Sequence, residues 1–243
     1  MIDFSLTDEQ KMLVEMTRSF VEQEMLPHEE TLERTNTLPP KLAAVLKKQS
    51  MELGLHACNL PEEVGGGGLD AVSVMLIEKE LGRTSLALAE CAHRPLNILA
   101  ACEGEQVTQF LEPTIKGEKR DCIAMTEPGA GSDLRGMKCK AVCDGDEWVI
   151  SGEKHFISQA SVSDYCVLFA ATGEEETPKG FKKRISAFLV AFDDPGVEVA
   201  PGYRNVSHRG YTNNILRFDN ARIPAWRMMG PEGDGFRLVN EWL

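Results

Sequence analysis

The chain lacks an excess of basic residues, and this absence excludes one large class of function. Its 243 residues include 26 Lys and Arg against 38 Asp and Glu, so the formal net charge is −12. Proteins that bind nucleic acid or an anionic membrane surface need positive charge, because contacts to phosphate supply much of the affinity. We therefore expect no nucleic acid and no membrane as partners.

Long apolar runs are also missing. No stretch reaches the roughly 20 apolar residues of a transmembrane helix. The amino terminus, MIDFSLTDEQ, has neither the basic cluster and apolar segment of a secretory signal nor the Arg-rich character of a mitochondrial presequence. The sequence therefore predicts a cytoplasmic bacterial protein, or a mitochondrial matrix protein if the chain is a processed eukaryotic form.

The seven cysteines lack the pairing that a disulfide framework or a zinc site requires. Their number is odd, and no two of them are separated by two residues. Cys139 and Cys143 lie four apart in a strand-like segment, where we expect them to share one buried face. The five histidines are scattered without metal-ligand spacing. We expect reduced thiols and no metal site.

The first half of the sequence contains helical periodicity. Thr7 and Gln10 have the spacing of a capping box, and apolar residues at helical spacing follow up to Pro27, which is expected to end the helix. A second helix is expected to begin at Pro39-Pro40 and to stop at Gly54. Residues 60–70, LPEEVGGGGLD, predict a connecting turn, because the Lys-Ser/Thr pair of a phosphate-binding loop does not follow the glycines.

Three further helical segments complete this half. Asp70 is expected to cap a helix over residues 71–81, which is apolar on nearly all sides and should therefore be buried. Residues 85–102 predict one buried helical segment, and residues 105–115 a shorter helix that Pro113 interrupts. A compact helical bundle accounts for these elements.

From residue 121 the periodicity changes to that of strands. Residues 138–152 alternate around Asp144-Gly145, which is a hairpin turn signal. Strand-like runs recur over residues 165–171, 185–192, 197–200 and 214–218, and short strands at this spacing predict a small antiparallel barrel or sandwich. The polar segment 173–184 is acidic and then basic, and we expect a solvated loop at a hairpin tip there.

The sequence therefore predicts an α+β fold in three parts. An amino-terminal helical domain covers residues 1–120, and a middle β domain covers residues 121–233. Residues 234–243, with a glycine-rich turn before a helix that begins near Phe236, are expected to be the start of a carboxy-terminal helical domain.

The most informative stretch is CIAMTEPGAGSD, residues 122–133. It begins as a buried strand and opens into a turn of small residues, in which Pro128 fixes its own φ and Gly129 and Gly131 leave room at the main chain. Such a turn can present N–H groups to a flat polar or anionic ligand. The same composition suits an ordinary tight turn, so these residues alone leave both interpretations open.

The stretch TEPGAGSD, residues 126–133, resembles the signature of the acyl-CoA dehydrogenase family, whose members are flavoenzymes. Residues 151–160, SGEKHFISQA, resemble the family segment that lies against the flavin, and residues 218–224, FDNARIP, resemble the end of a third landmark. The start of that landmark departs from the family, because Val206-Ser207 replace the usual Met-Gly. The resemblance covers residues 1–243, which are only part of the family's usual length.

This resemblance implies FAD as the cofactor and assigns residues to it. The main-chain groups of Met125 and Thr126, with the Thr126 hydroxyl, would bind the pyrimidine side of the flavin ring. Phe156 would pack on the ring, where many members have Trp, and the Ser158 hydroxyl would lie near flavin N5. Ser132 would reach a pyrophosphate oxygen.

For the substrate, the resemblance implies an acyl-CoA thioester, with Ser132 and, more weakly, Arg209 as contacts. Without the resemblance, Phe156 would be an ordinary core residue, and Lys154 and His155 would be surface residues. The matched order and spacing of two segments favours the functional interpretation.

The reaction implied is an α,β-dehydrogenation in fatty acid metabolism. A carboxylate removes the α-proton while the β-hydrogen leaves as hydride to flavin N5. In the family this base belongs to the carboxy-terminal bundle, so it is expected beyond Leu243 and no catalytic residue is predicted within the chain. An electron-transfer flavoprotein or similar acceptor, and a homo-oligomer (dimer or tetramer) of the full-length form, are further implications.

Two alternatives remain open at this point. One is another flavoenzyme on the same scaffold, namely an acyl-CoA oxidase, a nitroalkane oxidase or a flavin monooxygenase. The other is a non-catalytic truncated or split subunit that acts as a binding module. The length and branching of the acyl chain cannot be read from these residues.

Overall fold

The computed structural model describes residues 5–177 and 180–242, which form two compact units. One, the helical unit, contains the residues up to Pro95 together with Asn205–Tyr211. The other, the sheet unit, contains Leu96–Arg204 and the residues from Thr212 on. These two units do not decide between the three predicted domain ranges, which stay a prediction. No helix in the described part of the chain combines the length and apolar character needed to cross a bilayer.

The helical unit begins with α1 (Asp8–Phe20), and the predicted capping box is present at its start. The prediction that Pro27 ends this helix is wrong. A π-helical turn, Val21–Met25, and a 3₁₀ turn, Leu26–His28, lead directly into α2 (Glu29–Thr35). Pro27 is tolerated because it lies in the first turn of the 3₁₀ segment, where a missing N–H removes no hydrogen bond.

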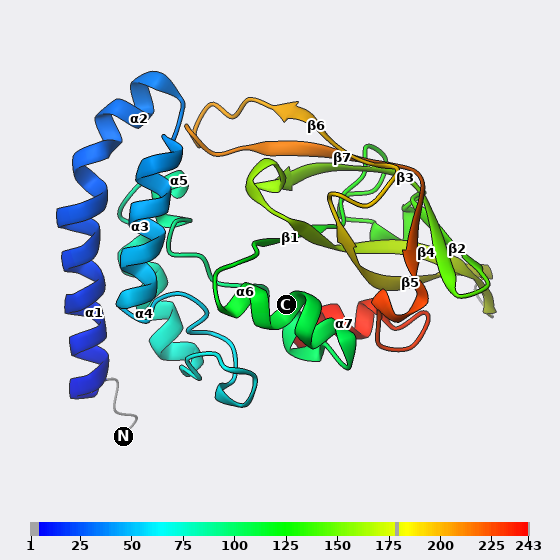
Figure 1. Ribbon diagram of the computed structural model, residues 1–243, viewed down its shortest axis with the longest axis horizontal. Coiled ribbons are helices and arrows are strands. Elements are labelled where there is room, and N and C mark those ends of the chain that lie inside the picture. Colours follow the sequence, from blue (N-terminus) through cyan, green and yellow to red (C-terminus); the bar gives the residue numbers. More distant parts are fainter. Residues whose placement is uncertain (1–4, 178–179, 243) are drawn as a thin grey trace. The chain divides into compact units, whose positions relative to one another are not determined.

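Two more helices contribute to the core of this unit. α3 (Pro40–Glu52) begins at the predicted proline pair, and Gly54 follows it with a φ of 71°. After the glycine-rich turn, Asp70 accepts hydrogen bonds from Val72 and Ser73 and caps α4 (Ala71–Leu81), as predicted. α1 packs on α4, and the two are drawn with α3 in Figure 1.

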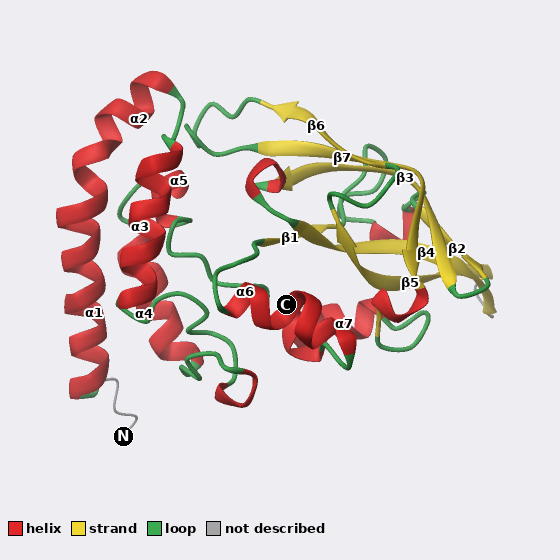
Figure 2. Ribbon diagram, viewed as in Figure 1, coloured by secondary structure: helices red, strands yellow, loops and turns green. Residues whose placement is uncertain are grey.

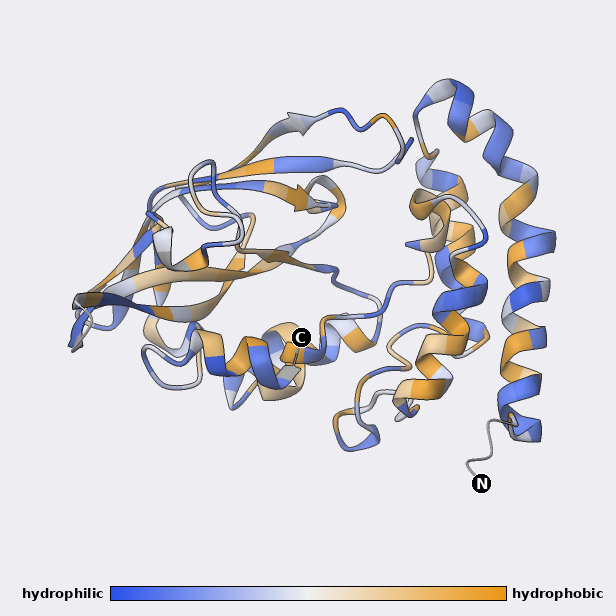
Figure 3. Cartoon of the chain, turned by 180° about the vertical axis from the view of Figure 1, so that it is seen from behind, coloured by the Kyte–Doolittle hydropathy of each residue, from blue (hydrophilic) through white to orange (hydrophobic). Residues whose placement is uncertain are grey.

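The prediction that α4 is buried on nearly all sides is wrong. Only one face is buried, that of Ser73, Ile77, Glu80 and Leu81, whereas Val72 and Met75 are more than half exposed. This spacing is the ordinary stripe of a helix that packs on one side, and two of its four positions are polar. Hydrophilic and hydrophobic residues likewise alternate along α1 in Figure 3.

Residues 85–102 do not form one helix, contrary to the prediction. α5 (Leu86–Ala89) is a single turn, and a 3₁₀ helix, Asn97–Ala101, follows only after an irregular segment that contains Pro95. A proline disfavours helical backbone at the preceding residue and cannot donate to the turn before it. The predicted helix over residues 105–115 is present, because a π-helical segment, Val107–Leu111, leads into α6 (Glu112–Ile115) and places Pro113 in the first turn.

The sheet unit contains one curled, eight-stranded sheet that forms a half-barrel (Figure 2). Its strands are β1 (Asp121–Ala124), β2 (Lys140–Asp144), β3 (Glu147–Ser158), β4 (Tyr165–Thr177), β5 (Gly180–Ala191), β6 (Val197–Tyr203), β7 (Asn213–Pro224) and β8 (Met228–Met229). Their order is β6-β7-β3-β2-β4-β5-β8, with β1 beside β4. The sheet is mixed rather than antiparallel, because β4 runs parallel to both β1 and β2. The α+β class is confirmed.

The strands extend further than their sequence patterns indicated. Residues 173–184 were expected to be a loop, but 173–177 continue β4 and 180–184 continue β5, with Glu174 opposite Lys183 and Glu175 opposite Lys182. The change of sign therefore reflects cross-strand charge pairs, one of which closes to 3.0 Å between Lys182 and Glu175. The hairpin tip, residues 178–179, lies outside the described residues.

Smaller predictions in this unit had mixed outcomes. The hairpin between β2 and β3 is present, but its turn is centred one residue later, because Asp144 pairs with Glu147. Cys139 is buried whereas Cys143, one residue from the turn, is exposed, so the two do not share a buried face. α7 (Gly235–Trp242) begins within one residue of the predicted start and packs on β5.

The two outermost strands of the sheet, β6 and β8, are unlike the others. β6 contains Pro201 and Gly202, and its pairing with β7 shifts register between Ala200 and Tyr203. β8 is only two residues long.

Candidate functional site

The turn after β1 is a tight four-residue turn. The Glu127 N–H donates to the Ala130 carbonyl at 3.0 Å, and the Ala130 N–H donates back to the Glu127 carbonyl at 3.2 Å. Pro128 and Gly129 occupy the two central positions, as their residue types favour. The turn therefore has a fixed main-chain conformation.

Two glycines, one in this turn and one directly after it, have no structural requirement within the chain. Neither Gly129 nor Gly131 has a left-handed φ, and a Cβ added at either would meet no atom within 4 Å. Gly152 on β3 is different, because its φ is 141° and a Cβ there would lie 2.7 Å from the Cα of Cys139. The open space over Gly129 and Gly131 fits a turn that another molecule approaches closely.

Phe156 occupies a strained bulge of β3. The pairing with β7 shifts register between Lys154 and Ile157, and Phe156 has a φ of 58°. A left-handed conformation of a bulky residue is unfavourable by about 1–3 kcal/mol and often marks a functional position. The bulge turns the ring outward, so Phe156 is 54% exposed and stacks on Tyr203 with ring centroids 4.3 Å apart. Phe156 is therefore not a core residue, whereas its neighbour Ile157 is buried.

One hydrogen bond joins the turn to the bulge. The N–H of His155 donates to the Thr126 carbonyl at 2.8 Å, so Thr126 and Phe156 lie on adjacent segments. Ser158 ends the same strand opposite Asn213. The structure thus brings together the first two of the segments that the resemblance singled out, and the third begins beside the second, because Phe218 on β7 pairs with Gly152 on β3.

Several polar groups at this place have no partner within residues 5–177 and 180–242. They are the N–H of Thr126 and the hydroxyls of Thr126, Ser132 and Ser158, for which no intramolecular hydrogen bond is formed. Ser132 is exposed and the other two are half-buried. Directional donors beside an exposed aromatic ring are what a flat heterocycle with a phosphate tail requires, so these residues fit FAD.

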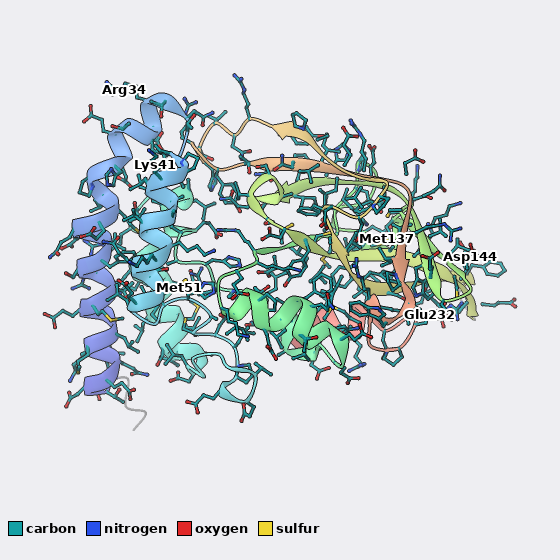
Figure 4. All side chains as sticks on the ribbon, viewed as in Figure 1. Arg34, Lys41, Met51, Met137, Asp144 and Glu232 are labelled. Carbon is teal, nitrogen blue, oxygen red and sulfur yellow. The ribbon has the colours of Figure 1, made fainter. Side chains whose placement is uncertain are left out.

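Beneath the turn lies a buried ion pair. The Nζ of Lys154 is fully buried and contacts the Glu127 carboxylate at 2.7 Å, the Met125 carbonyl at 2.9 Å and the Met137 sulfur at 3.8 Å. Figure 4 labels Met137 among the strands. Lys154 is therefore not the surface residue that its charge alone predicted.

Glu127 caps main-chain donors as well as pairing with Lys154. Its carboxylate accepts the N–H groups of Lys138 and Cys139. Burial raises the pKa of this carboxyl, but the hydrogen bonds from Lys138 and Lys154 outweigh burial, and the pKa lies below its ordinary value. The Glu127 side chain points into the protein, so it does not repel an anion over the turn.

A cavity of about 700 Å³ opens beside the same turn. It contains none of the five predicted flavin contacts. Its lining consists of Glu127, Pro128, Gly129, Lys138, Cys139, Gly152, Glu153, Gly196, Glu198, Arg217, Phe218 and Asp219.

The predicted substrate contact Arg209 belongs to the helical unit. Its Nε donates to the Glu33 carbonyl at 3.2 Å. The role of Arg209 toward a substrate stays a prediction. The part of the chain that the structure describes contains no group of three or more side chains able to hold a metal.

Two residues of the site were not predicted as such. Lys154 lies on the same strand face as the buried Trp148 and Ile150, so the period of two already indicated an inward side chain. Tyr203, whose hydroxyl lies 2.7 Å from Nδ1 of His155, comes from β6, and no local pattern reveals that β6 lies near β3.

Comparisons with known proteins agree with this geometry. Residues 7–118 match the family model described as acyl-CoA dehydrogenase, N-terminal domain, and residues 122–221 match acyl-CoA dehydrogenase, middle domain. A probable acyl-CoA dehydrogenase, YngJ, of Bacillus subtilis is 34% identical over 97% of this chain and 62% of its own length. The mitochondrial short-chain specific acyl-CoA dehydrogenase of Bos taurus is 35% identical over 98% of this chain and 57% of its own.

Solved structures give the same result. An acyl-CoA dehydrogenase from Bacillus anthracis, complexed with FAD, superposes with a TM-score of 0.83 at 29% identity, covering 99% of this chain and 40% of that one. Fold, site and matches together point to one family of proteins. The chain belongs to the acyl-CoA dehydrogenase family, whose members are FAD-dependent. It spans less than two thirds of the length of these relatives.

Proposed function

We propose that the chain forms the flavin-facing part of an FAD-dependent enzyme that introduces an α,β double bond into an acyl-CoA thioester. The observation that carries this proposal is the hydrogen bond from the His155 N–H to the Thr126 carbonyl. It holds the small-residue turn beside the strained, outward-facing ring of Phe156. Phe156 stacks on Tyr203 but stays 54% exposed, and a ligand that packs on the exposed part of the ring accounts for the strain.

The residues divide the recognition of FAD among them. Phe156 stacks on the flavin ring, Thr126 and the main chain of Met125 bind its pyrimidine side, and Ser158 donates near N5. Ser132 binds the pyrophosphate and lies next to the substrate. When bound, FAD supplies the hydride acceptor of the reaction.

Other parts of the activity rest on family membership. The carboxylate that removes the α-proton is proposed to come from outside residues 1–243, and Arg209 is a weaker candidate for binding the acyl-CoA. We also propose a role in fatty acid metabolism, an electron-transfer flavoprotein or similar acceptor, a dimer or tetramer, and a location in the bacterial cytoplasm or the mitochondrial matrix.

The experiment is an NMR titration of the chain with FAD, because NMR detects weak binding. We expect shifts at Thr126, Ser132 and Ser158, and affinity too low for the flavin to stay bound during purification. Phe156→Ala should weaken binding on the order of tenfold, the size of one aromatic contact. The matched control is Phe181→Ala, which removes a ring that is 76% exposed on β5.

The control separates stacking from a general effect of losing an aromatic side chain. Equal affinities of the two variants, or no shift at Thr126 with millimolar-scale FAD, would contradict the proposal.

A further inference from the structure

Three consecutive residues of β3 act on the turn in three ways. The Lys154 ammonium contacts the Met125 carbonyl, the His155 N–H contacts the Thr126 carbonyl, and Phe156 presents its ring. His155 joins β3 to Thr126 through its main chain, and Phe156 is exposed because it lies on the bulge. Lys154 remains to be explained, because a buried lysine is unfavourable unless it does more than fill space.

The contact of Lys154 with the Met125 carbonyl involves the peptide group between Met125 and Thr126. The Met125 carbonyl and the Thr126 N–H belong to the same amide, and no peptide bond in the described chain is cis. In a trans amide the N–H points away from the carbonyl oxygen. The Thr126 N–H therefore points away from Lys154, and it is the donor that has no acceptor within the described residues.

A cation on an amide oxygen changes the nitrogen at the other end. It draws electron density toward the oxygen, so the N–H becomes more acidic and a stronger donor. Lys154 is 0% exposed, so water does not screen this effect. The carboxylate of Glu127 compensates the charge of Lys154. It also accepts hydrogen bonds from two main-chain N–H groups, so less of its negative charge acts on the Met125–Thr126 amide.

We propose that Lys154 is a positioning residue that polarises the Met125–Thr126 amide and so strengthens the Thr126 N–H as a donor to the pyrimidine side of the flavin. This inference rests on the proposed function for the identity of the acceptor. The Thr126 N–H would be a donor without Lys154 as well, but a weaker one. A lysine with only a structural role would require neither this carbonyl nor a donor left open on its far side.

The test compares Lys154→Met with the double variant Glu127→Gln/Lys154→Met, which leaves no unpaired charge and keeps an oxygen for one of the two N–H groups that Glu127 accepts, those of Lys138 and Cys139. Lys116→Met is the matched control, because Lys116 pairs with Glu112 on the surface of the same unit. The first readout is base-catalysed hydrogen exchange of the Thr126 N–H, measured by NMR without FAD.

Polarisation and structural support predict opposite results. If Lys154 polarises the amide, the Thr126 N–H exchanges about tenfold faster in the unaltered protein than in an unstructured peptide, which is one pK unit of acidity. In the double variant that excess disappears and exchange slows. If Lys154 only holds the turn together, exchange in the variants stays the same or becomes faster. The measurement on the unaltered protein needs no variant to fold, and a rate at or below the peptide value would overturn the proposal.

The second readout is the FAD titration, followed at the Thr126 amide. We expect affinity to fall about threefold to tenfold in the double variant and to be unchanged in Lys116→Met. Equal FAD affinity of the double variant and the unaltered protein overturns the role of Lys154 while leaving the proposed function intact. A lack of FAD shifts in every form of the protein overturns the proposed function and, with it, this role.

Discussion

In each unit of the chain a buried glutamate pairs with basic side chains, and the two glutamates are held differently. Glu80 on α4 accepts hydrogen bonds from Arg18 at 3.0 and 2.9 Å and from Arg83 at 3.1 Å, and these arginine side chains are 48% and 43% exposed. Glu127 is paired instead with Lys154, which is fully buried, and with two main-chain N–H groups.

The difference lies in access to water. The arginines of Glu80 remain partly hydrated, so in this network, which links α1 to α4, only the carboxylate is desolvated. Lys154 has lost all of its hydration, and a buried ammonium of this kind contributes little net stability compared with apolar residues of the same size. The comparison indicates that the first network is structural and that the second is kept for what it does to the turn.

The largest effect is expected from breaking the buried pair. Lys154→Met leaves Glu127 ionised and without its partner, so the free energy of unfolding should fall by about 3–5 kcal/mol. Urea unfolding followed by the fluorescence of the sheet unit measures it. The double variant Glu127→Gln/Lys154→Met should recover more than half of this loss, and a double variant as unstable as the single one would remove the basis of the comparison.

A smaller effect is expected at the hydrated network. Glu80→Gln keeps the shape and loses the charge, and the exposed arginines can turn to water. We therefore expect a loss of about 1–2 kcal/mol, well below that of a fully buried pair. The same urea experiment applies, and a loss equal to that of Lys154→Met would show that hydration of the partners does not matter.

Acid pH sharpens the contrast further. Hydrogen bonds from Arg18 lower the pKa of Glu80 from 4.5 to about 2, against burial, which raises it, and Arg83 adds to the lowering. Because the folded-state pKa is depressed, this stability is fully present above the ordinary pKa and is lost as the pH falls toward the folded value. The difference in free energy of unfolding between the unaltered protein and Glu80→Gln should therefore be full at about pH 6 and shrink by about pH 3. A difference that does not change with pH would contradict the assigned pKa.

The smallest effect is expected at an exposed pair. Lys116→Met removes the contact of 3.0 Å to Glu112, whose side chain is 44% exposed. Surface ion pairs of this kind contribute little, and the free energy of unfolding should change by less than about 0.5 kcal/mol. A larger change would mean that the loss in Lys154→Met cannot be assigned to burial.

Local signals in the sequence predicted much of the fold. The capping box at Thr7, the Asp70 cap and the hairpin before β3 each depend on residues close in the chain, and all three are present. The errors involve contacts that no local pattern contains. The exposed side of α4 depends on what packs against it, and the extension of β4 and β5 beyond residue 173 depends on charges that meet only across the strands.

In the candidate site, too, local features could be predicted from the sequence and long-range contacts could not. The turn over residues 126–133 and the segment around Phe156 could be singled out from the resemblance. The burial of Lys154 could have been inferred from strand alternation, but its contact with the Met125 carbonyl could not, because it spans 29 positions of the chain. The left-handed φ of Phe156 was equally hidden, because nothing in KHFIS indicates a bulge.

The ends of the sheet have a consequence for how the protein behaves at high concentration. A row of free main-chain donors and acceptors on an outer strand invites a foreign chain to add to it, and long flat edges are the usual starting points of insoluble aggregates. Pro201 offers no donor and the neighbouring bulge bends β6, while β8 provides only two residues for a newcomer to match. At the β6 end the half-barrel therefore resists growing by strand addition, although it is not closed.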